Sequence, residues 1–155
     1  MKIIVSACLT GENCKYSGGN NYCAALMELA KEHILIPVCP EVLGGLPIPR
    51  KPGEIVDGVV RNQDGTSVDA EYRRGAQLAL EIALREGAEL AILQSRSPSC
   101  GVKQIYDGSF SGVKIPGKGV FAALLEEKGI EALDSGELTP ETIRQYINKT
   151  PMGAE

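Results

Sequence analysis

The sequence predicts an α/β fold: a single three-layer, Rossmann-like domain spanning residues 1–155, with a mainly parallel sheet and a small hairpin insertion. Three observations predict it. Short, almost continuously apolar runs lie at 3–5, 34–38 and 90–93, as expected for strands that are covered on both faces. Segments with apolar residues at helical spacing separate these runs. A chain of 155 residues with 43% apolar content is also long enough to bury one substantial core.

The first half of the chain is expected to hold two strands, a helix and the hairpin. In chain order we expect a strand at 2–7, a loop at 11–20, a helix at 22–32, a strand at 33–38, an irregular loop at 40–52 and a hairpin at 55–68. The helix is indicated by Ala25, Leu26 and Leu29, which fall on one side. The turn of the hairpin is expected at 62–65, where Asn-Gln-Asp-Gly separates two apolar runs.

The second half is expected to alternate helices and strands. In order we expect a helix at 70–86, a strand at 90–93, an extended or hairpin-like segment at 104–115, a helix at 119–128, a strand at 130–133 and a helix at 139–148. Asp69 is a suitable N-cap for the first helix and Gly87 ends it, as Gly129 ends the second. Pro140 suits the first position of the last helix. The apolar stripe of the longest helix is formed by Tyr72, Ala76, Ala79, Leu80 and Ala83.

Composition and charge exclude several classes of function. The net charge of -4, the absence of Trp and the low aromatic content argue against a nucleic-acid partner. No apolar run reaches the length of a membrane span, and the first run is too short for a signal peptide, so we expect no membrane partner and a cytoplasmic protein. In that compartment cysteines are more often ligands or catalysts than disulfide partners. The oligomeric state is not readable.

Three of the five cysteines follow predicted strands. Cys8 and Cys39 come directly after the first two runs, and Cys100 comes a short polar stretch after the third. Right-handed crossovers place the carboxyl ends of parallel strands at one edge, where ligands bind in open α/β sheets. The three thiols are therefore expected to converge on a metal or cluster site. The alternative is that each is a small buried apolar side chain, as free cysteines often are.

The surrounding residues narrow the chemistry. The cysteine spacing is not Cys-x-x-Cys, which disfavours a zinc ribbon or a thioredoxin-type dithiol. His33 is the single histidine and opens an apolar strand, so a histidine-assisted nucleophile lacks its usual base. Three thiolates suit a [4Fe–4S] cluster with one open iron, although Cys14 as a fourth ligand would close it. Cys23 is expected to be packing.

Polar residues beside these cysteines are candidates for the reaction. Glu41, two residues after Cys39, is the best acid–base candidate, with a surface glutamate as the alternative. The hydroxyl-rich stretch 95–101 is suited to bind a polar ligand or simply to form a turn. Arg50 and Lys15 are candidate ligand clamps, or solvated cations.

The chain resembles the 2-thiouracil desulfidase family, formerly a domain of unknown function, over about residues 2–135. The most specific motifs are Cys-Pro-Glu-Val-Leu-Gly-Gly at 39–45 and Ser-Pro-Ser-Cys-Gly at 97–101. Further matches are Val-Ser-Ala-Cys-Leu at 5–9, Cys-Lys-Tyr at 14–16, Arg50, Ile-Tyr-Asp-Gly-Ser-Phe-Ser-Gly at 105–112, and 117–125. Thr10 and Ser17 depart from the family pattern, where a second aliphatic and an acidic residue are common.

The resemblance implies a [4Fe–4S] cluster held by Cys8, Cys39 and Cys100. It also implies a catalytic glutamate, Glu41, and a catalytic serine, Ser97, with Ser99 as the alternative. The remaining candidates for substrate binding are Ser99, Arg50 and Lys15.

The implied activity is desulfidation of a thiolated pyrimidine such as 2-thiouracil. The open iron binds the thiocarbonyl sulfur, and the products are the oxo-compound and hydrogen sulfide. A free thiobase, a nucleoside, a nucleotide and thiolated RNA all carry the same group. The cysteines alone are also compatible with an iron–sulfur or metal-binding carrier or sensor, and with a cluster-free sulfurtransferase that passes a persulfide.

Overall fold

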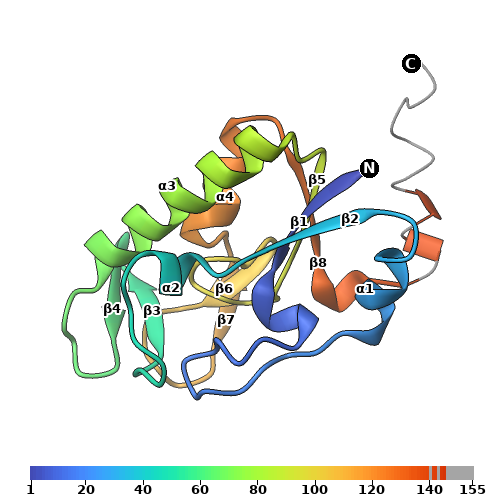
Figure 1. Cartoon of the computed structure of the whole chain (residues 1–155). Coiled ribbons are helices and arrows are strands. Elements are labelled where there is room, and N and C mark those ends of the chain that lie inside the picture. Colours follow the sequence, from blue (N-terminus) through green and yellow to red (C-terminus); the bar gives the residue numbers. More distant parts are fainter. Residues whose placement is uncertain (140, 143, 146–155) are drawn as a thin grey trace.

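The centre of the protein is a parallel sheet in the order β2-β1-β5-β8 (Figure 1). The computed structural model describes residues 1–139, 141–142 and 144–145. The strands are β1 (Lys2–Ser6), β2 (Ile34–Val38), β5 (Leu90–Leu93) and β8 (Glu131–Asp134). Every pairing in this sheet is parallel, with Ile4 of β1 opposite both Ile36 and Ala91. The predicted mainly parallel sheet is therefore confirmed.

Helices cover both faces of this sheet. On one face, α1 (Ala24–Leu29) belongs to a buried cluster with the alternate sheet residues Ile3, Val5 and Ile92. On the other face, α3 (Asp69–Glu86) and α4 (Val120–Glu127) pack with Ile4 and Ala91 (Figure 1). Because strand side chains alternate between faces, these apolar runs fill two separate cores. The predicted three-layer arrangement is confirmed.

The long helix α3 buries the stripe that its spacing predicts. All five stripe residues are at most 3% exposed: Tyr72, Ala76, Ala79, Leu80 and Ala83. Gly87 ends the helix in the left-handed conformation, with a φ of 73°. The small alanines let α3 lie close to the sheet.

The hairpin is confirmed, and it has a further turn besides the predicted one. The strands β3 (Gly53–Val56) and β4 (Val59–Asn62) are joined by Asp57 and Gly58, which have φ values of 50° and 80°. A two-residue Asp-Gly loop fits the twist of the strands, and this shorter signal decides the register. The predicted turn at 62–65 also forms: Asn62 Oδ1 accepts from the backbone of Asp64 and Thr66, and the chain returns antiparallel along β4, with Arg61 opposite Ser67.

Two other predictions about helices are corrected. Asp69 is not the N-cap of α3: that position is Val68, and Asp69 Oδ1 accepts from Val60 N at 3.0 Å. The backbone of β4 has an open N–H beside the helix, and Asp69 satisfies it. The predicted irregular segment 40–52 begins with a one-turn helix, α2 (Pro40–Leu43). The predicted helix at 22–32 forms over the shorter α1, and the one predicted at 139–148 falls largely outside the described residues.

The order of the strands creates a crevice. From β1 the chain passes to β2, its neighbour on one side. From β5 it passes to β8, on the other side. The connections therefore leave β1 and β5 in opposite directions. The crevice beyond the carboxyl ends of such strands is where open α/β sheets bind ligands. The 3₁₀ turns η1 (Ala7–Thr10) and η2 (Ser135–Glu137) follow β1 and β8, and a second hairpin, β6 (Gln104–Tyr106) and β7 (Lys114–Pro116), lies in contact with β3. The hairpin-like segment predicted at 104–115 is confirmed.

None of the helices in the described part of the chain is long and apolar enough to cross a membrane.

Candidate active site

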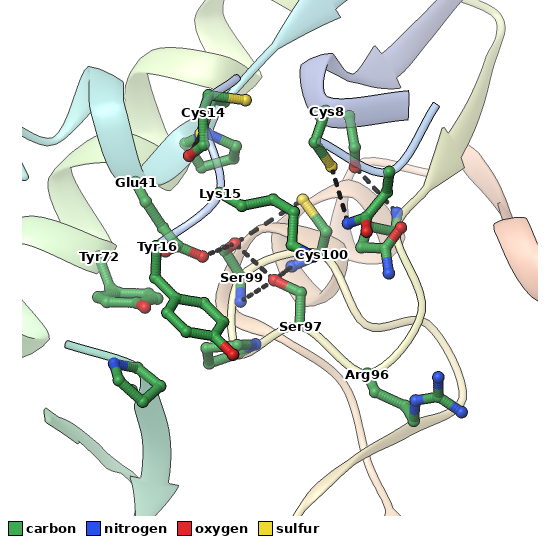
Figure 2. Close-up of a pocket in the computed structure, with 18 of the residues that line it drawn as sticks. Cys8, Cys14, Lys15, Tyr16, Glu41, Tyr72, Arg96, Ser97, Ser99 and Cys100 are labelled. Atoms are coloured by element: carbon green, nitrogen blue, oxygen red, sulfur yellow. Dashed lines mark hydrogen bonds between the residues drawn. The ribbon is translucent and has the colours of Figure 1, made fainter. Parts of the chain in front are cut away.

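A cavity of about 550 Å³ opens at this crevice (Figure 2). It is lined from β1, η1, the loop after β5, both hairpins and α3. Every residue that the sequence singles out for chemistry lines it: Cys8, Cys14, Lys15, Cys39, Glu41, Arg50, Ser97, Ser99 and Cys100. The convergence expected at one edge of the sheet is therefore what the structure shows.

The three strand-end cysteines reach the cavity from separate elements. Cys8 lies in η1, and Asn21 Nδ2 donates to its Sγ at 3.5 Å. Cys39 is the N-cap of α2 directly after β2. Cys100 is buried in the loop after β5, where Ser99 Oγ lies 3.7 Å from its Sγ. The sheet therefore fixes three thiols whose positions in the sequence are far apart.

Cys14 lies with Cys8 and Cys39. Hydrogen bonds to Cys39 and to Cys8 raise the pKa of the Cys14 thiol, so that it stays protonated. The hydrogen bond from Cys14 to Cys39 lowers the pKa of Cys39 to about 7, and the hydrogen bond from Cys14 to Cys8 is the main cause of the lowered pKa of Cys8. In the metal-free protein Cys14 is therefore a hydrogen-bond donor to the sulfurs of Cys8 and Cys39, whose lowered pKa values favour the thiolate.

Cys100 has the opposite environment. Burial raises the pKa of its thiol to about 12, although a hydrogen bond with Ser6 opposes this effect. Such a thiol is unreactive by itself, but a bound metal removes the proton of a coordinating thiol. Cys100 is therefore poorly suited to be a free nucleophile and remains suited to be a ligand.

The donor set consists of thiols, the ligand type that an iron–sulfur cluster takes. Among the described residues, no three His, Cys, Asp or Glu side chains are arranged around one metal ion. A cluster is a larger group, and its cysteine sulfurs stand further apart than the ligands of one zinc. The cavity offers soft thiols from several elements, which is the ligand type that such clusters take.

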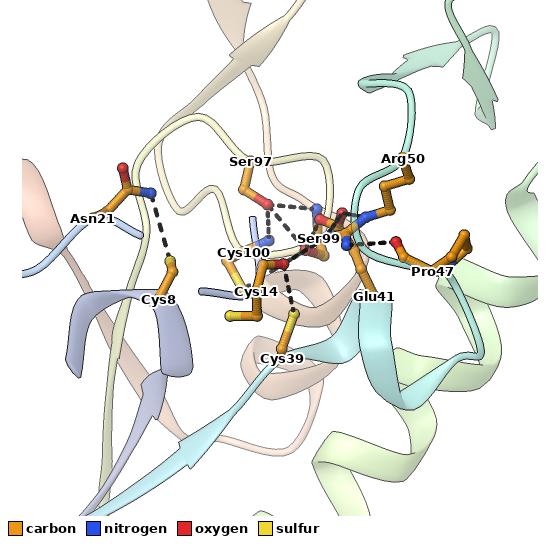
Figure 3. Close-up of polar contacts among 10 residues, drawn as sticks. All are labelled: Cys8, Cys14, Asn21, Cys39, Glu41, Pro47, Arg50, Ser97, Ser99 and Cys100. Atoms are coloured by element: carbon orange, nitrogen blue, oxygen red, sulfur yellow. Dashed lines mark hydrogen bonds and ion pairs between the residues drawn. The ribbon is translucent and has the colours of Figure 1, made fainter. Parts of the chain in front are cut away.

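Glu41 occupies the first turn of α2 and is held by Arg50. Glu41 Oε1 accepts from Arg50 Nε at 3.1 Å and from Nη2 at 2.9 Å, and the two side chains are only 13% and 7% exposed. Arg50 Nη2 also donates to the carbonyl of Cys14 at 2.9 Å (Figure 3). Arg50, expected as a ligand clamp, therefore binds the carboxylate and the loop that carries Cys14.

The second oxygen of Glu41 meets the serines. Ser99 Oγ donates to Glu41 Oε2 at 2.9 Å, and Ser97 Oγ lies 2.9 Å from Ser99 Oγ (Figure 2). Ser97 Oγ in addition accepts from the backbone N–H of Ser99 at 3.1 Å and of Cys100 at 3.0 Å. Because the Ser99 hydroxyl has one hydrogen, and gives it to Glu41, Ser97 is the donor between the two serines.

Tyr72 is a site residue that sequence reasoning missed. Burial, together with the charge of Glu41 and a hydrogen bond to it, raises the pKa of the Tyr72 hydroxyl. The phenol is therefore protonated and donates to the carboxylate. The helical pattern assigns Tyr72 to the apolar stripe of α3. Its hydroxyl, the one polar group in a stripe of Ala and Leu, is the signal in the sequence for a further role.

The loop that carries the serines is anchored at both ends. Gln94 N donates to Ser6 Oγ at 2.9 Å, and Phe121 N at the start of α4 donates to Ser99 O at 2.8 Å. Gly119 lies so close that a Cβ there would be 2.4 Å from the carbonyl carbon of Ser99. The N–H groups at the start of α4 thus hold the backbone of the loop that carries the two hydroxyls.

The remaining candidates are placed as follows. Lys15 lies half-buried at the cavity, where its charge contributes to lowering the pKa of Cys8. Cys23 packs against the cluster around α1, as predicted, and outside the cavity lining. His33 stands just before β2, away from the cavity. Asn21 and Ser6, which contact the cysteine sulfurs, gave no signal in the sequence.

The chain is similar to proteins of one family. A protein of Bacillus subtilis (strain 168), described as "Uncharacterized protein YbbK", is 38% identical, and the match covers 88% of this chain and 97% of that protein. A solved structure described as a [4Fe-4S]-dependent thiouracil desulfidase, TudS, is 40% identical with a TM-score of 0.86, and the match covers 94% of this chain and 98% of that one. The profile of the 2-thiouracil desulfurase family matches residues 3–137. The chain belongs to the 2-thiouracil desulfurase family.

Proposed function

We propose that the protein is a [4Fe–4S]-dependent desulfidase that acts on a thiolated pyrimidine such as 2-thiouracil. The thiocarbonyl and water are converted to a carbonyl and hydrogen sulfide, with no net transfer of electrons. One observation carries the proposal: the Glu41–Ser99 pair lies in the same cavity as three strand-end cysteines. Membership of the 2-thiouracil desulfurase family supports the same activity.

Cys8, Cys39 and Cys100 are the residues that would hold the cluster. When bound through three cysteines, a [4Fe–4S] cluster supplies one open iron, a soft Lewis acid suited to the sulfur of a thiocarbonyl. The protonated Cys14 is proposed to stay outside the ligand set, where it donates to Cys8 and Cys39.

Glu41 is proposed as the base, reached through the two serines. A water, or an enolised substrate, gives a proton to Ser97 Oγ as Ser97 passes its own to Ser99, and Ser99 passes its own to Glu41 Oε2. Glu41 then returns a proton by the same route to the departing sulfide. Each serine ends the cycle as it began. The hydroxyl that water leaves on the carbon gives up the second proton as the carbonyl forms, so both protons of water leave with sulfur as hydrogen sulfide.

The partners of Glu41 orient it for this role. Arg50 occupies Oε1 and leaves Oε2 to the serines, while Tyr72 donates from α3. A base that must accept and release a proton each turnover needs a fixed position, because proton transfer requires hydrogen-bond distance. We propose Arg50 and Tyr72 as the residues that provide it.

The substrate is proposed to be a small molecule. Lys15 is the remaining candidate clamp at the cavity, with Ser99 as a hydroxyl contact. The net charge of -4 argues against binding thiolated RNA, because nucleic-acid affinity depends on cations that neutralise phosphates.

One observation favours a second candidate. The pKa of Cys39, lowered to about 7, is that of a thiol able to act as a nucleophile, as a persulfide sulfurtransferase requires. A sulfurtransferase needs a sulfur acceptor and no iron, whereas the desulfidase needs iron and water.

The test is to prepare the protein without oxygen, reconstitute it with iron and sulfide, and supply 2-thiouracil. We expect a brown protein with about four iron and four sulfide per chain, and catalytic release of hydrogen sulfide and uracil. A colourless protein that leaves 2-thiouracil unchanged, but transfers the outer sulfur of thiosulfate to a thiol acceptor with release of sulfite, would establish the second candidate. A brown protein without turnover of any thiolated pyrimidine would indicate a carrier or sensor.

A further inference from the structure

We propose that Phe110 is a specificity-determining residue, the aromatic surface on which the planar ring of the substrate stacks, and that Glu54 is the positioning residue that holds it there. This inference rests on the proposed function, since it names what recognises the ring of the thiolated base. Both residues line the same cavity as Glu41 and the cysteines.

Glu54 is an acidic side chain buried in β3, with only 9% of its surface exposed. Its Oε1 accepts from the backbone N–H of Gly108 at 3.0 Å and of Phe110 at 3.1 Å. A carboxylate is costly to bury unless hydrogen bonds meet its charge. These two bonds meet it, and they fasten the loop between β6 and β7 to β3.

The loop is built to hold one conformation. Phe110 has a φ of 57°, in the left-handed region that non-glycine residues seldom occupy. Asp107 N donates to Val113 O, and Ser109 N donates to Asp107 Oδ1, both at 2.9 Å. Gly108 lies against β3, where a Cβ would be 2.7 Å from Ile55 O. Strain at a residue beside a cavity persists only where the surroundings impose it, which points to a use for that side chain.

A ring-binding surface is the use that suits Phe110. The chain has two phenylalanines, and the other, Phe121, is fully buried in the core. The groups described around the reacting atoms are thiols, hydroxyls and a carboxylate, which act on the thiocarbonyl but offer no surface to the face of a pyrimidine. Three tyrosines also line the cavity: Tyr72 is engaged with Glu41, Tyr16 is 46% exposed, and Tyr106 lies in β6 of the same hairpin as Phe110. A half-buried phenyl ring fixed at the cavity supplies such a surface.

The test compares KM and kcat of reconstituted variants on 2-thiouracil, together with the Kd for uracil. Alanine substitution of an aromatic residue that stacks on a base commonly weakens binding about 5- to 100-fold. For Phe110→Ala we therefore expect KM and the uracil Kd to rise by about tenfold or more, with kcat within about threefold and iron content unchanged. Phe110→Tyr keeps an aromatic ring and should keep KM and the uracil Kd near their wild-type values. The matched control is Val113→Ala, since Val113 is exposed on the same hairpin and outside the cavity lining.

The role of Glu54 is tested by the same comparison of KM with kcat. Glu54→Gln keeps an acceptor oxygen and should retain KM, whereas Glu54→Ala releases the loop and should raise KM as Phe110→Ala does. Phe110→Ala and Glu54→Ala are expected to remove the same stacking interaction. The double variant should therefore bind uracil no more weakly than Phe110→Ala alone. Should Glu54→Ala fail to fold, Phe110→Leu carries the test, with an expected rise in KM.

The proposed function and the role of Phe110 are overturned by different results. A reconstituted wild-type protein that releases no sulfide overturns the proposed function. A wild-type protein that turns over, while Phe110→Ala and Phe110→Leu keep its KM and uracil Kd, overturns this inference alone.

Discussion

Ser99 Oγ donates to Glu41 Oε2 at 2.9 Å, joining residues that are 58 positions apart in the sequence. Glu41 follows β2 and lies two residues after Cys39. Ser99 directly precedes Cys100 in the loop after β5. The hydrogen bond therefore couples the acid–base group to two of the proposed cluster ligands. A shift of either segment would separate the base from the thiols.

Removing the Ser99 hydroxyl should stop proton transfer without loss of iron. We expect Ser99→Ala to lower kcat about 10²-fold or more, the contribution that a positioned acid–base group commonly makes. Ser17→Ala, on an exposed loop, is the control and should keep full activity. A Ser99→Ala variant with wild-type kcat would exclude the relay.

Ser97→Ala should also lower kcat, but with an additional cost in stability. Ser97 Oγ accepts from the backbone of Ser99 and of Cys100, and these N–H groups would lose their partner. Leaving a buried donor unpaired costs about 1–3 kcal/mol. Urea unfolding should show this loss for Ser97→Ala and less for Ser99→Ala; equal stabilities would indicate that the two serines have the same role.

Cys14 should be dispensable for iron, unlike the proposed ligands. Unlike the three proposed ligands, Cys14 does not follow a strand of the sheet, and in the metal-free protein it donates hydrogen bonds to Cys39 and Cys8. We expect Cys14→Ser to retain iron, as should the control Cys23→Ser, while Cys8→Ser, Cys39→Ser and Cys100→Ser lose it. Iron measured after anaerobic reconstitution decides the matter. If Cys14→Ser also loses iron, Cys14 is a ligand and the open iron is not available.

The thiols should differ in their pH dependence of alkylation in the reduced, iron-free protein. Because the pKa of Cys39 is lowered to about 7, its reactive thiolate fraction should rise through pH 7, two units below the ordinary value of 9.0. Burial raises the pKa of Cys100 to about 12, so Cys100 should remain unmodified at pH 8. Iodoacetamide labelling followed by mass spectrometry measures both. In Cys14→Ala the profile of Cys39 should move to higher pH, and an unmoved profile would show that Cys14 is not its cause.

Asp69 should stabilise the fold above its pKa and not in acid. Burial opposes its ionisation, but Val60 N–H and Arg73 together hold the pKa of Asp69 below the ordinary 3.8. A depressed pKa means that the stabilisation is present above 3.8 and disappears as the pH falls through the lower, folded value. Asp69→Ala should lower the free energy of unfolding at pH 7 by about 1 kcal/mol. Urea titrations should show a smaller difference in strong acid, and a difference that grows there would contradict this assignment.

The sequence predicted the elements that local pattern determines. Apolar runs marked the strands, and the position of Cys8 and Cys39 at strand ends predicted their convergence. The contacts of Asp69 and Tyr72 were not predictable, since Val60 and Glu41 are brought beside α3 only by the tertiary fold. The turn at 62–65 was predicted and forms, whereas the Asp57-Gly58 turn was missed because only the pairing of β3 with β4 reveals it.

In the site, too, local sequence identified residues, whereas the tertiary fold determined their contacts. Glu41 was identified from its neighbours in sequence, but its ion pair with Arg50 depends on how the loop 44–50 folds back. Family resemblance named Ser97 and Ser99 together, whereas the order of the proton path follows from which hydroxyl faces Glu41. The roles of these residues stay predictions.

The central claim is that Glu41 works as a base beside an intact cluster, and one comparison tests it most directly. Glu41→Gln and the wild type should be reconstituted without oxygen, matched for iron and sulfide, and compared for hydrogen sulfide released from 2-thiouracil, with the exposed Glu28→Gln as control. We predict equal iron in all three proteins, full activity in the control, and at least a roughly 10²-fold lower kcat for Glu41→Gln. A Glu41→Gln protein that carries the full cluster and releases sulfide at the wild-type rate would contradict the account.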